Sequence, residues 1–272
     1  MTIEVFAPAK VNLTLHVTGQ REDGYHTLDS LVVFVDVGDQ LRLNEAAQMS
    51  LNVAGPYAKG VPTDSSNLVW SASALCGLTA EIGLEKHLPN AAGIGGGSAD
   101  AAAVLRAAIE LGYSPQGDIA SLGADVPVCM SSAPQRMQGI GDKLTSVDNL
   151  PNLWMVLVNP MHHVSTPSVF AALKTKSNAP MPAALPFCET IDDFCSWLGG
   201  QRNDLENPAI EVEPFIAKVL DMFPDALISR MSGSGATCFG IYPSAQASEI
   251  AAARIKKSNP DWWVADAKVL KS

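Results

Sequence analysis

The feature that most constrains this chain is a glycine-rich stretch, Pro89–Asp100, in which four of the five residues from Gly93 to Gly97 are glycine. Glycine buries no side chain and loses the most backbone entropy on folding, so packing does not explain such a cluster. Backbone N–H groups without neighbouring side chains can surround an anion. We call this stretch the glycine loop.

The residues around the glycine loop predict a strand before it and a helix after it. Ile82, Leu84 and Leu88 fall on alternate positions, with Lys86 breaking the apolar run, which is typical of a strand. The alanine-rich segment that follows predicts a helix capped by Ser98 or Asp100. Strand, glycine loop and helix N-terminus together predict a phosphate site, with a glycine-rich turn that binds nothing as the alternative.

Two common phosphate-binding motifs do not match the glycine loop. A P-loop needs a lysine before its Ser or Thr, whereas Ser98-Ala99 follows the glycines here. A dinucleotide-binding fingerprint needs a third glycine three places after the second, where this chain has Ser98.

Length and composition limit the classes of function. A chain of 272 residues is long enough for about two domains of roughly 150 residues each. A net charge of −10 argues against a general nucleic-acid or anionic-membrane binder. The five cysteines form no CxxC pair, and their odd number suits a reducing compartment. With no basic, apolar leader in the first residues and no long apolar run, we expect a cytoplasmic protein without a membrane partner.

The N-terminal segment predicts a strand with two different faces. Val11, Leu13, Leu15 and Val17 alternate with Lys10, Asn12, Thr14 and His16. Lys10 and Asn12 together could hold a phosphate and a hydroxyl, but this segment taken alone favours a solvated strand face.

Three shorter patterns follow in the first half of the chain. Tyr25-His26 after Gly24 suits a planar ligand or ordinary packing at a strand entrance. Ser65-Ser66-Asn67 predicts the cap of a helix over 68–75, and Ser114-Pro115 predicts the start of a helix that ends near Gly123. Asp125 is a single carboxylate in an apolar stretch, where either a tuned carboxylate or a turn cap is expected.

The second half predicts the element order β-α-β-β-α-β, which is the split βαβ or ferredoxin-like pattern. We expect a domain boundary near Pro151, giving domains over 1–150 and 151–272, with residues 265–272 able to return to the first. Two helices, over 191–198 and 212–222, form an insertion. Between the two middle strands, Ser232–Gly235 predicts either an ordinary hairpin or a loop directed at the glycine loop. The fold class is α+β.

Taken together, these motifs resemble a known superfamily. Pro8–Asn12, the glycine loop and Ser232–Ala236 occur in the order of the three motifs of the GHMP kinases, named for galactokinase, homoserine kinase, mevalonate kinase and phosphomevalonate kinase. More narrowly, the following segments are similar to the 4-diphosphocytidyl-2-C-methyl-D-erythritol kinases: Gly24-Tyr25-His26, Leu122–Pro127, Arg202–Glu206 and Met231–Ala236. The resemblance covers nearly the whole chain.

The resemblance implies a two-domain GHMP kinase fold, with an N-terminal ribosomal-protein-S5-domain-2-like domain and a C-terminal ferredoxin-like domain. It also implies transfer of the γ-phosphoryl group of ATP, with Mg²⁺, to the 2-hydroxyl of 4-diphosphocytidyl-2-C-methyl-D-erythritol in non-mevalonate isoprenoid biosynthesis. The protein would be a monomer or homodimer that binds this small molecule and no nucleic acid.

By the same resemblance, Asp125 is the catalytic base and Lys10 lies beside it. ATP would be bound by Asn67, Pro89, Asn90, Ala91, Ala92, Gly93, Ile94, Gly95, Gly96, Gly97, Ser98 and Ala99, with Ser98 as a possible Mg²⁺ contact through ATP. The acceptor substrate would be bound by Asn12, Tyr25, His26, Thr166, Phe170 and Gly235. Tyr25 and Phe170 would enclose the cytosine, and His26 would read its polar edge.

The chain departs from the family pattern on the nucleotide side. The interval from Asn67 to Pro89 and the segment leading to Asp125 are shorter than expected, and Ala99-Asp100 stands where Ser-Asn or Ser-Asp is frequent. Two other functions are open at this point. One is a GHMP-type kinase for mevalonate or homoserine, and the other is a non-catalytic ATP-binding relative. Tyr25-His26 argues against the first, and the pair Lys10 and Asp125 against the second.

Overall fold

The computed structural model describes residues 2–271 and divides into two compact units. The first unit comprises the chain up to Lys10 together with residues 37–90 and 95–132. The second comprises residues 11–36, 91–94 and 133 onward. In the first half of the chain, strands β1 (Thr2–Asn12) and β3 (His26–Glu45) each contribute residues to both units.

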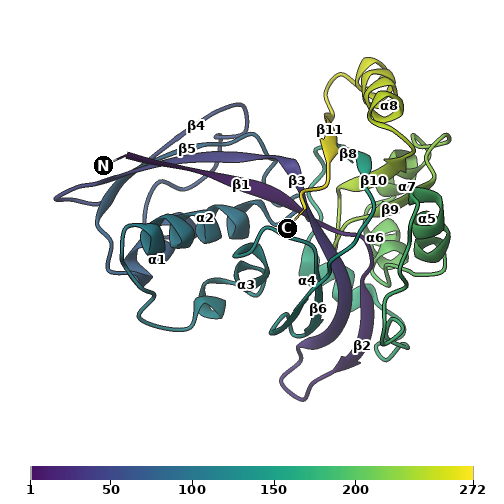
Figure 1. Ribbon diagram of the computed structural model, residues 1–272, viewed down its shortest axis with the longest axis horizontal. Helices are drawn as coiled ribbons and strands as arrows, with labels where there is room; N and C mark the ends of the chain where they lie inside the picture. Colours follow the sequence, from purple (N-terminus) through teal and green to yellow (C-terminus); the bar gives the residue numbers. More distant parts are fainter. Residues whose placement is uncertain (1, 272) are drawn as a thin grey trace. The chain divides into compact units, whose positions relative to one another are not determined.

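The first unit is a sheet covered on one face by helices. β5 (Ala80–Glu85) pairs in parallel with β4 (Ser50–Ala54) and antiparallel with the second half of β3. Helices α1 (Leu68–Leu75) and α2 (Gly96–Glu110) pack against each other on one side of these strands (Figure 1). The small alanine side chains of α2 are buried, which lets neighbouring elements approach the helix closely.

Two short elements complete the first unit. The 3₁₀ turn η1 (Ile119–Leu122) begins at Asp118, whose side chain accepts a hydrogen bond from the backbone N–H of Ala120. The α3 helix (Val126–Cys129) begins at Asp125. The helix predicted to start at Ser114-Pro115 is therefore wrong, because the chain first turns at Asp118 and closes only one short turn before Gly123.

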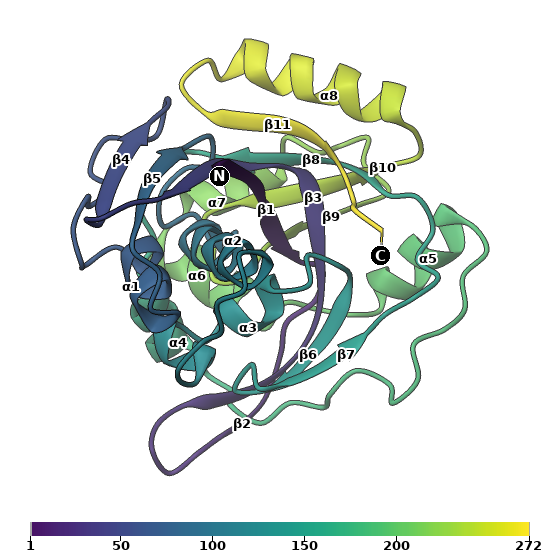
Figure 2. The same cartoon turned by 60° about the vertical axis from the view of Figure 1, so that its left-hand side comes forward.

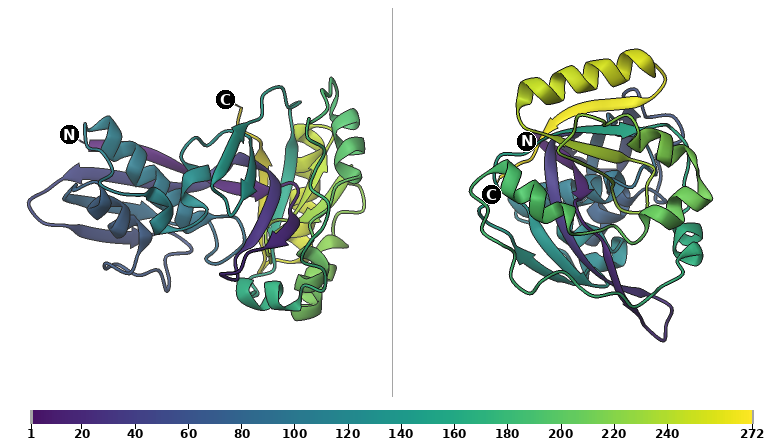
Figure 3. Two further views of the ribbon diagram at one scale, coloured as in Figure 1. Left: turned by 90° about the horizontal axis from the view of Figure 1, so that it is seen from below. Right: turned by 90° about the vertical axis from the view of Figure 1, so that its right-hand side faces the viewer.

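The second unit contains an antiparallel four-stranded sheet in the order β11-β8-β10-β9. Its strands are β8 (Trp154–Asn159), β9 (Ile228–Met231), β10 (Cys238–Tyr242) and β11 (Trp263–Lys268). With α8 (Ala245–Ser258) before β11, this confirms the predicted ferredoxin-like order. α8 lies along β11 in Figure 2, and the two yellow elements again lie side by side in Figure 3 (right).

One hydrophobic core joins the sheet of the second unit to its helices. Val156 and Val158 on β8 and Cys238 on β10 belong to a buried cluster with Ile255 of α8. The other helices of this unit are α4 (Thr166–Ala172), α5 (Ile191–Gly199), α6 (Glu206–Val212) and α7 (Phe215–Leu220). The helix expected over 212–222 starts only at Phe215, because Pro214 separates α6 from α7.

The remaining strands of the second unit explain why residues 11–36 belong to it. The first half of β3 pairs with β2 (His16–Gln20) and with β6 (Gln135–Gly139), which pairs with β7 (Lys143–Ser146). Near the C-terminus, the Leu270 N–H donates to the Phe34 carbonyl oxygen on β3 at 2.8 Å. The two compact units are each made of several chain segments and are not separated by a single boundary. The domains 1–150 and 151–272 remain a prediction from the sequence.

Both faces of the N-terminal strand are buried. Lys10, Asn12, Thr14 and His16 are all buried, like the apolar residues between them. The solvated face favoured by the local pattern is therefore wrong, because each polar side chain has a partner from a distant segment. For example, Thr14 donates to the Met181 sulfur, and the His16 Nδ1 lies 3.1 Å from the Ala179 carbonyl oxygen.

Two further features of the chain are its cysteines and the length of its helices. All five cysteines are free and buried. None of the helices within residues 2–271 combines the length and the apolar character needed to cross a membrane.

Candidate functional site

The first backbone N–H groups of α2 lie before its first intrahelical hydrogen bond. Gly95 is the N-cap at φ +65°, with no side-chain cap, and the first intrahelical bond runs from the Ala99 N–H to the Gly95 carbonyl oxygen at 2.8 Å. The N–H groups of Gly96, Gly97 and Ser98 therefore precede the first helical bond. Together with the positive end of the helix dipole, they form a site that suits a phosphate.

The predicted cap of this helix is wrong. The helix begins at Gly96, two residues before Ser98, so neither Ser98 nor Asp100 occupies the N-cap position. The Asp100 side chain is instead buried and accepts a hydrogen bond from Lys86 at 2.8 Å. Ala99 offers no free N–H, because its N–H belongs to the helix.

The glycines at the start of α2 differ in whether packing leaves room for a side chain. A Cβ on Gly95 would lie 3.2 Å from the Lys10 Cβ, so close contact with Lys10 requires glycine there, as does the positive φ. A Cβ on Gly96 or Gly97 would meet its nearest atom at 3.5 and 3.9 Å, which is ordinary contact. Packing would accept a side chain at both positions, so packing does not explain the glycines there.

Lys10 and Asp125 form an ion pair next to these donors. The Lys10 Nζ donates to Asp125 Oδ2 at 2.6 Å. The lysine side chain is 5% exposed, whereas that of Asp125 is 37% exposed. The pair therefore joins a buried cation to a carboxylate that a ligand can reach.

Ser98 lies on the same side of the first unit as the segment before Asp125. A Cβ built on Gly123 would be 4.0 Å from the Ser98 hydroxyl oxygen. Hydroxyl and carboxylate oxygens are suitable ligands for Mg²⁺, which is usually held by one or two protein oxygens plus substrate phosphates. Residues 2–271 contain no cluster of three His, Cys, Asp or Glu side chains that could hold a metal without such a substrate.

Beneath the start of α2 lies a buried group of three charged side chains, Lys86, Asp39 and Asp100, which we call the buried triad. The Lys86 Nζ donates to both Asp39 and Asp100. Asp39 also accepts from the backbone N–H groups of His87 and Leu88, at 2.6 and 2.9 Å. The triad thereby connects β3, the end of β5 and α2 at the point where the glycine loop begins.

The two carboxylates of the triad have unequal surroundings. Each Asp39 oxygen accepts a hydrogen bond, but Asp100 Oδ1 has no partner among the described residues. Burial raises the pKa of Asp100 to about 7, although Lys86 opposes this rise. Burial would lower the pKa of Lys86, but the attraction of Asp100 and Asp39 outweighs burial and raises it. One ammonium cannot neutralise two carboxylates, so the extra proton belongs on Asp100.

In the second unit, residues 91–94 of the glycine loop lie against Ser232–Gly235, the second glycine turn. The Ser232 hydroxyl donates to the Gly93 carbonyl oxygen at 3.2 Å, and Thr237 donates to the Ala92 carbonyl oxygen through its hydroxyl at 2.6 Å. Gly93 has φ +74°, and a Cβ there would be 2.5 Å from the Gly235 carbonyl oxygen. The second glycine turn is thus directed at the glycine loop, which was one of the two predicted alternatives.

Two predicted acceptor-site residues adjoin the second glycine turn. The Asn12 N–H donates to the Ser232 hydroxyl at 3.0 Å, and the hydroxyls of Thr166 and Ser234 lie 2.7 Å apart. Gly235 itself has φ +86° and lies against Met231, whose sulfur would be 2.7 Å from a Cβ at this position.

Two of the three residues of the predicted base site stack on each other. The His26 and Phe170 rings are stacked, with centroids 4.7 Å apart. Tyr25 is the adjacent residue on the turn and its side chain is 64% exposed. Burial and, secondarily, the charge of Lys176 lower the pKa of His26, which favours the neutral ring. Its Nε2 is buried and has no hydrogen-bond partner within the described chain.

Asn67 has a role within the protein. As predicted, it caps α1: its side chain accepts from the Val69 N–H at 2.9 Å and donates to the Pro62 carbonyl oxygen at 2.7 Å. Among the other predicted ATP residues, Pro89 is buried, whereas Asn90 and Ala91 are exposed.

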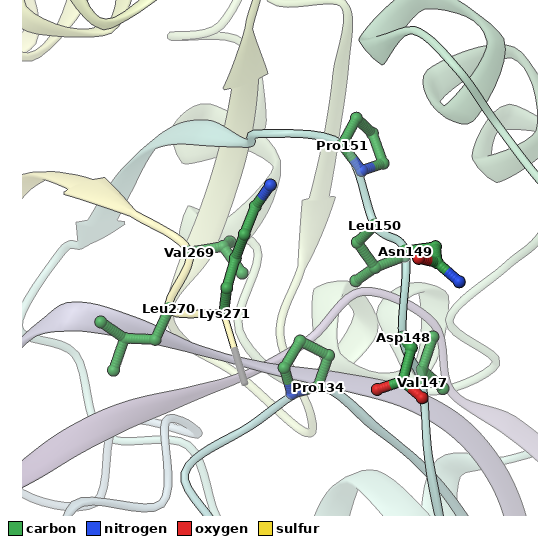
Figure 4. Close-up of a pocket in the computed structure, with 9 residues that line it drawn as sticks. All are labelled: Pro134, Val147, Asp148, Asn149, Leu150, Pro151, Val269, Leu270 and Lys271. Carbon is green, nitrogen blue, oxygen red and sulfur yellow. The ribbon is translucent and has the colours of Figure 1, made fainter.

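A separate cavity of about 270 Å³ lies in the second unit (Figure 4). It is lined by residues 147–151, by Pro134 and by the C-terminal segment from Val269 to Lys271. None of the predicted catalytic or binding residues lines it, so it is not the candidate site.

Sequence reasoning missed several residues that build the site. Lys86 was visible only as a break in an apolar run, and the sequence around Asp39 gave no signal. Ser30, which binds Asn12, is an ordinary serine that no sequence motif marks. Only tertiary structure brings these groups together.

The sequence matches two protein-family models and several known proteins. Residues 67–147 match the GHMP kinases N terminal domain, and residues 187–261 match the GHMP kinases C terminal domain. The chain is 55% identical over 265 residues to 4-diphosphocytidyl-2-C-methyl-D-erythritol kinase from Dinoroseobacter shibae, covering 96% of this chain and 92% of that protein. It is 52% identical over 279 residues to the enzyme of the same name from Ruegeria pomeroyi, covering 99% and 100% of the two chains.

Solved structures show the same fold. A crystal structure of 4-(cytidine 5'-diphospho)-2C-methyl-D-erythritol kinase is 30% identical, has a TM-score of 0.77, and covers 98% of this chain and all of that one. Homoserine kinase from Cytophaga hutchinsonii has a TM-score of 0.62 at 19% identity, covering 99% and 97% of the two chains. This second likeness concerns the fold alone.

The buried triad makes a prediction about the pH dependence of stability. Because the pKa of Asp100 is raised above its unfolded value near 4, the folded protein holds a proton between about pH 4 and 7 that the unfolded chain has lost. The contribution of Asp100 to stability therefore falls as the pH rises through this range. Relative to wild type, Asp100→Asn should gain roughly 2 kcal/mol of unfolding free energy between pH 5 and pH 8.

Urea unfolding at pH 5, 6, 7 and 8 measures this effect. Asp148→Asn, which changes an exposed carboxylate, serves as the control and should keep the pH dependence of wild type. Identical pH slopes for wild type and Asp100→Asn would contradict the assignment of the proton to Asp100.

Proposed function

Because this chain belongs to the GHMP kinases and, within them, to the family of 4-diphosphocytidyl-2-C-methyl-D-erythritol kinases, we propose that it phosphorylates the 2-hydroxyl of 4-diphosphocytidyl-2-C-methyl-D-erythritol. ATP is the phosphoryl donor and ADP the second product. The reaction would serve non-mevalonate isoprenoid biosynthesis. Full-length similarity to relatives of that name supports the substrate, and the site residues support the chemistry.

The observation that carries the proposal is the Lys10–Asp125 pair beside the start of α2. Asp125 Oδ2 is held by Lys10 at 2.6 Å, while the carboxylate as a whole stays accessible. Asp125 would accept the proton of the acceptor hydroxyl as its oxygen bonds to the γ-phosphorus. The bond from that phosphorus to the bridging oxygen breaks in the same transfer, and ADP leaves.

Lys10 has two roles in this proposal. Its ammonium orients the Asp125 carboxylate, and its positive charge offsets the negative charge on the transferring group. Its side chain is held in place because it lies against Gly95 and is almost completely buried.

We assign the ATP phosphates to the backbone N–H groups of Gly96, Gly97 and Ser98, which precede the first helical bond of α2. Mg²⁺ would be held by the ATP phosphates and the Ser98 hydroxyl, and when bound it would neutralise phosphate charge. The rest of the glycine loop, from Pro89 to Gly95, shapes this site. Asn67 remains on the adenosine side of the proposal through the family resemblance alone.

For the acceptor, we assign the cytosine to Tyr25, His26 and Phe170. A neutral His26 offers one donor and one acceptor, and its Nε2 is an unpartnered buried nitrogen beside the Phe170 ring. Since His26 stacks on Phe170 in this structure, cytosine would take the place of that contact or use the opposite ring face. Asn12, Thr166 and Gly235 would bind the remainder of the acceptor.

The first test is an ADP-release assay with Mg²⁺ and ATP. Three acceptors are offered separately: 4-diphosphocytidyl-2-C-methyl-D-erythritol, mevalonate and homoserine. We expect ADP release with the first alone, because mevalonate and homoserine carry no base that the aromatic site could bind. Release with mevalonate or homoserine would refute the substrate, and ATP binding without release from any acceptor would favour a non-catalytic relative.

The role of Asp125 is tested by Asp125→Asn. The substitution keeps the size of the side chain and an oxygen for Lys10, but it removes the base, so kcat should fall by roughly 10²- to 10⁴-fold. ATP affinity, measured by calorimetry, should change by less than about threefold, because that affinity depends on the helix N-terminus. Unchanged turnover would remove Asp125 from the role of base.

The base site is tested by Tyr25→Ala and Phe170→Ala. Each should raise the KM for the cytidyl acceptor by roughly 5- to 150-fold, since stacking on a base contributes about 1–3 kcal/mol. The KM for ATP should not change. Phe187→Ala is the matched control, because this aromatic side chain is 74% exposed and is not part of the site. A rise in the KM for ATP alone would reverse the assignment of the two reactants.

A further inference from the structure

A hydrogen-bonded chain in the second unit leads from Asn12 into the core. The Asn12 Nδ2 donates to the Ser30 hydroxyl oxygen at 2.7 Å, and the Ser30 hydroxyl in turn donates to the Thr14 carbonyl oxygen. Asn12 and Ser30 are 1% and 0% exposed. Both therefore exchange hydrogen bonds with the protein and not with bulk water.

The Ser30 hydroxyl decides which way the Asn12 carboxamide faces. A serine hydroxyl has one hydrogen, and here that hydrogen is used on the Thr14 carbonyl oxygen. Ser30 can therefore only accept from Asn12, so the NH₂ group of Asn12 must face Ser30. The reverse orientation would bring two oxygens together with no hydrogen between them.

This orientation leaves the carboxamide oxygen as the free end of Asn12. Asn12 Oδ1 is buried and has no hydrogen-bond partner among residues 2–271. It lies next to Gly233 in the second glycine turn, where a Cβ would be 3.4 Å from Oδ1 and 3.1 Å from the Gly93 carbonyl oxygen. The Gly93 carbonyl oxygen already accepts from the Ser232 hydroxyl, whereas Asn12 Oδ1 lacks a donor among residues 2–271 and suits a ligand that donates a hydrogen bond.

We infer that Ser30 is a positioning residue, which sets the Asn12 carboxamide so that its oxygen accepts a hydrogen bond from a hydroxyl of the acceptor substrate. A carboxamide oxygen accepts a hydrogen bond only from a donor such as a hydroxyl, so we assign this oxygen to the polyol part of the acceptor. The substrate part of this inference rests on the proposed function. The orientation part rests on the chain of hydrogen bonds alone.

A double-mutant cycle tests the substrate part. Ser30→Ala should lower kcat/KM for the acceptor about tenfold, the effect of one misdirected hydrogen bond, with the KM for ATP unchanged. Ser30→Thr restores the hydroxyl and should restore kcat/KM. In an Asn12→Ala background, Ser30→Ala should have no further effect on kcat/KM, because Ser30 acts only through Asn12.

The same cycle identifies a merely structural role. Urea unfolding of each variant measures the cost of removing the Ser30 hydroxyl. If kcat/KM falls by the same factor with and without the Asn12 side chain, or if Thr does not restore it, Ser30 acts on stability alone and the inference fails.

The orientation part is tested without any substrate. In NMR spectra, the side-chain NH₂ signals of Asn12, assigned by their loss in Asn12→Ala, should exchange slowly with solvent in wild type and in Ser30→Thr. In Ser30→Ala their exchange should become at least tenfold faster. Equal exchange in wild type and Ser30→Ala would overturn the orientation argument. Inactivity of wild type with the cytidyl acceptor would instead refute the proposed function and leave this result standing.

Discussion

The first unit depends on the buried ammonium of Lys86. This single cation draws Asp39 from β3 and Asp100 from α2 to the end of β5, and Asp39 uses its second oxygen to hold two backbone N–H groups of the next residues. Removing the Lys86 ammonium would leave two buried carboxylates without compensation, at a cost of about 3–5 kcal/mol. The strand end and the helix start are therefore fixed relative to each other where a ligand would need rigid donors.

The glycine loop is supported by different physical means along its length. Residues 92–93 are held through their carbonyl oxygens, which accept from Ser232 and Thr237, so that the N–H groups stay uninvolved in these contacts. Gly93 and Gly95 are explained by contacts within the protein. Gly93 lies close to the Gly235 backbone, and Gly95 lies close to the Lys10 side chain. Gly96 and Gly97 have room for a side chain and lack one, which is the pattern expected where backbone must reach a phosphate.

Local signals predicted the elements whose cause is local. Asn67 caps α1 through its own neighbours, and the order of strands and helices along the chain predicted the ferredoxin-like sheet. Predictions failed where distant residues decide the outcome. Lys10 and Asn12 are buried because Asp125 and Ser30 reach them from 115 and 18 positions away. Asp100 does not cap the helix as predicted, because its carboxylate accepts a hydrogen bond from Lys86.

The Lys86–Asp100 and Lys10–Asp125 ion pairs differ in how far a ligand can reach the carboxylate. Asp100 is 4% exposed and lies against Lys86, and its raised pKa shows that burial dominates over the pairing. Asp125 pairs with an equally buried lysine, yet its own side chain is 37% exposed, so an alcohol can reach it. An enclosed carboxylate stabilises an arrangement of elements, whereas a half-open one held by a fixed cation can exchange a proton with a ligand. This difference in access supports the proposed assignment of the base to Asp125 and of a supporting role to Asp100.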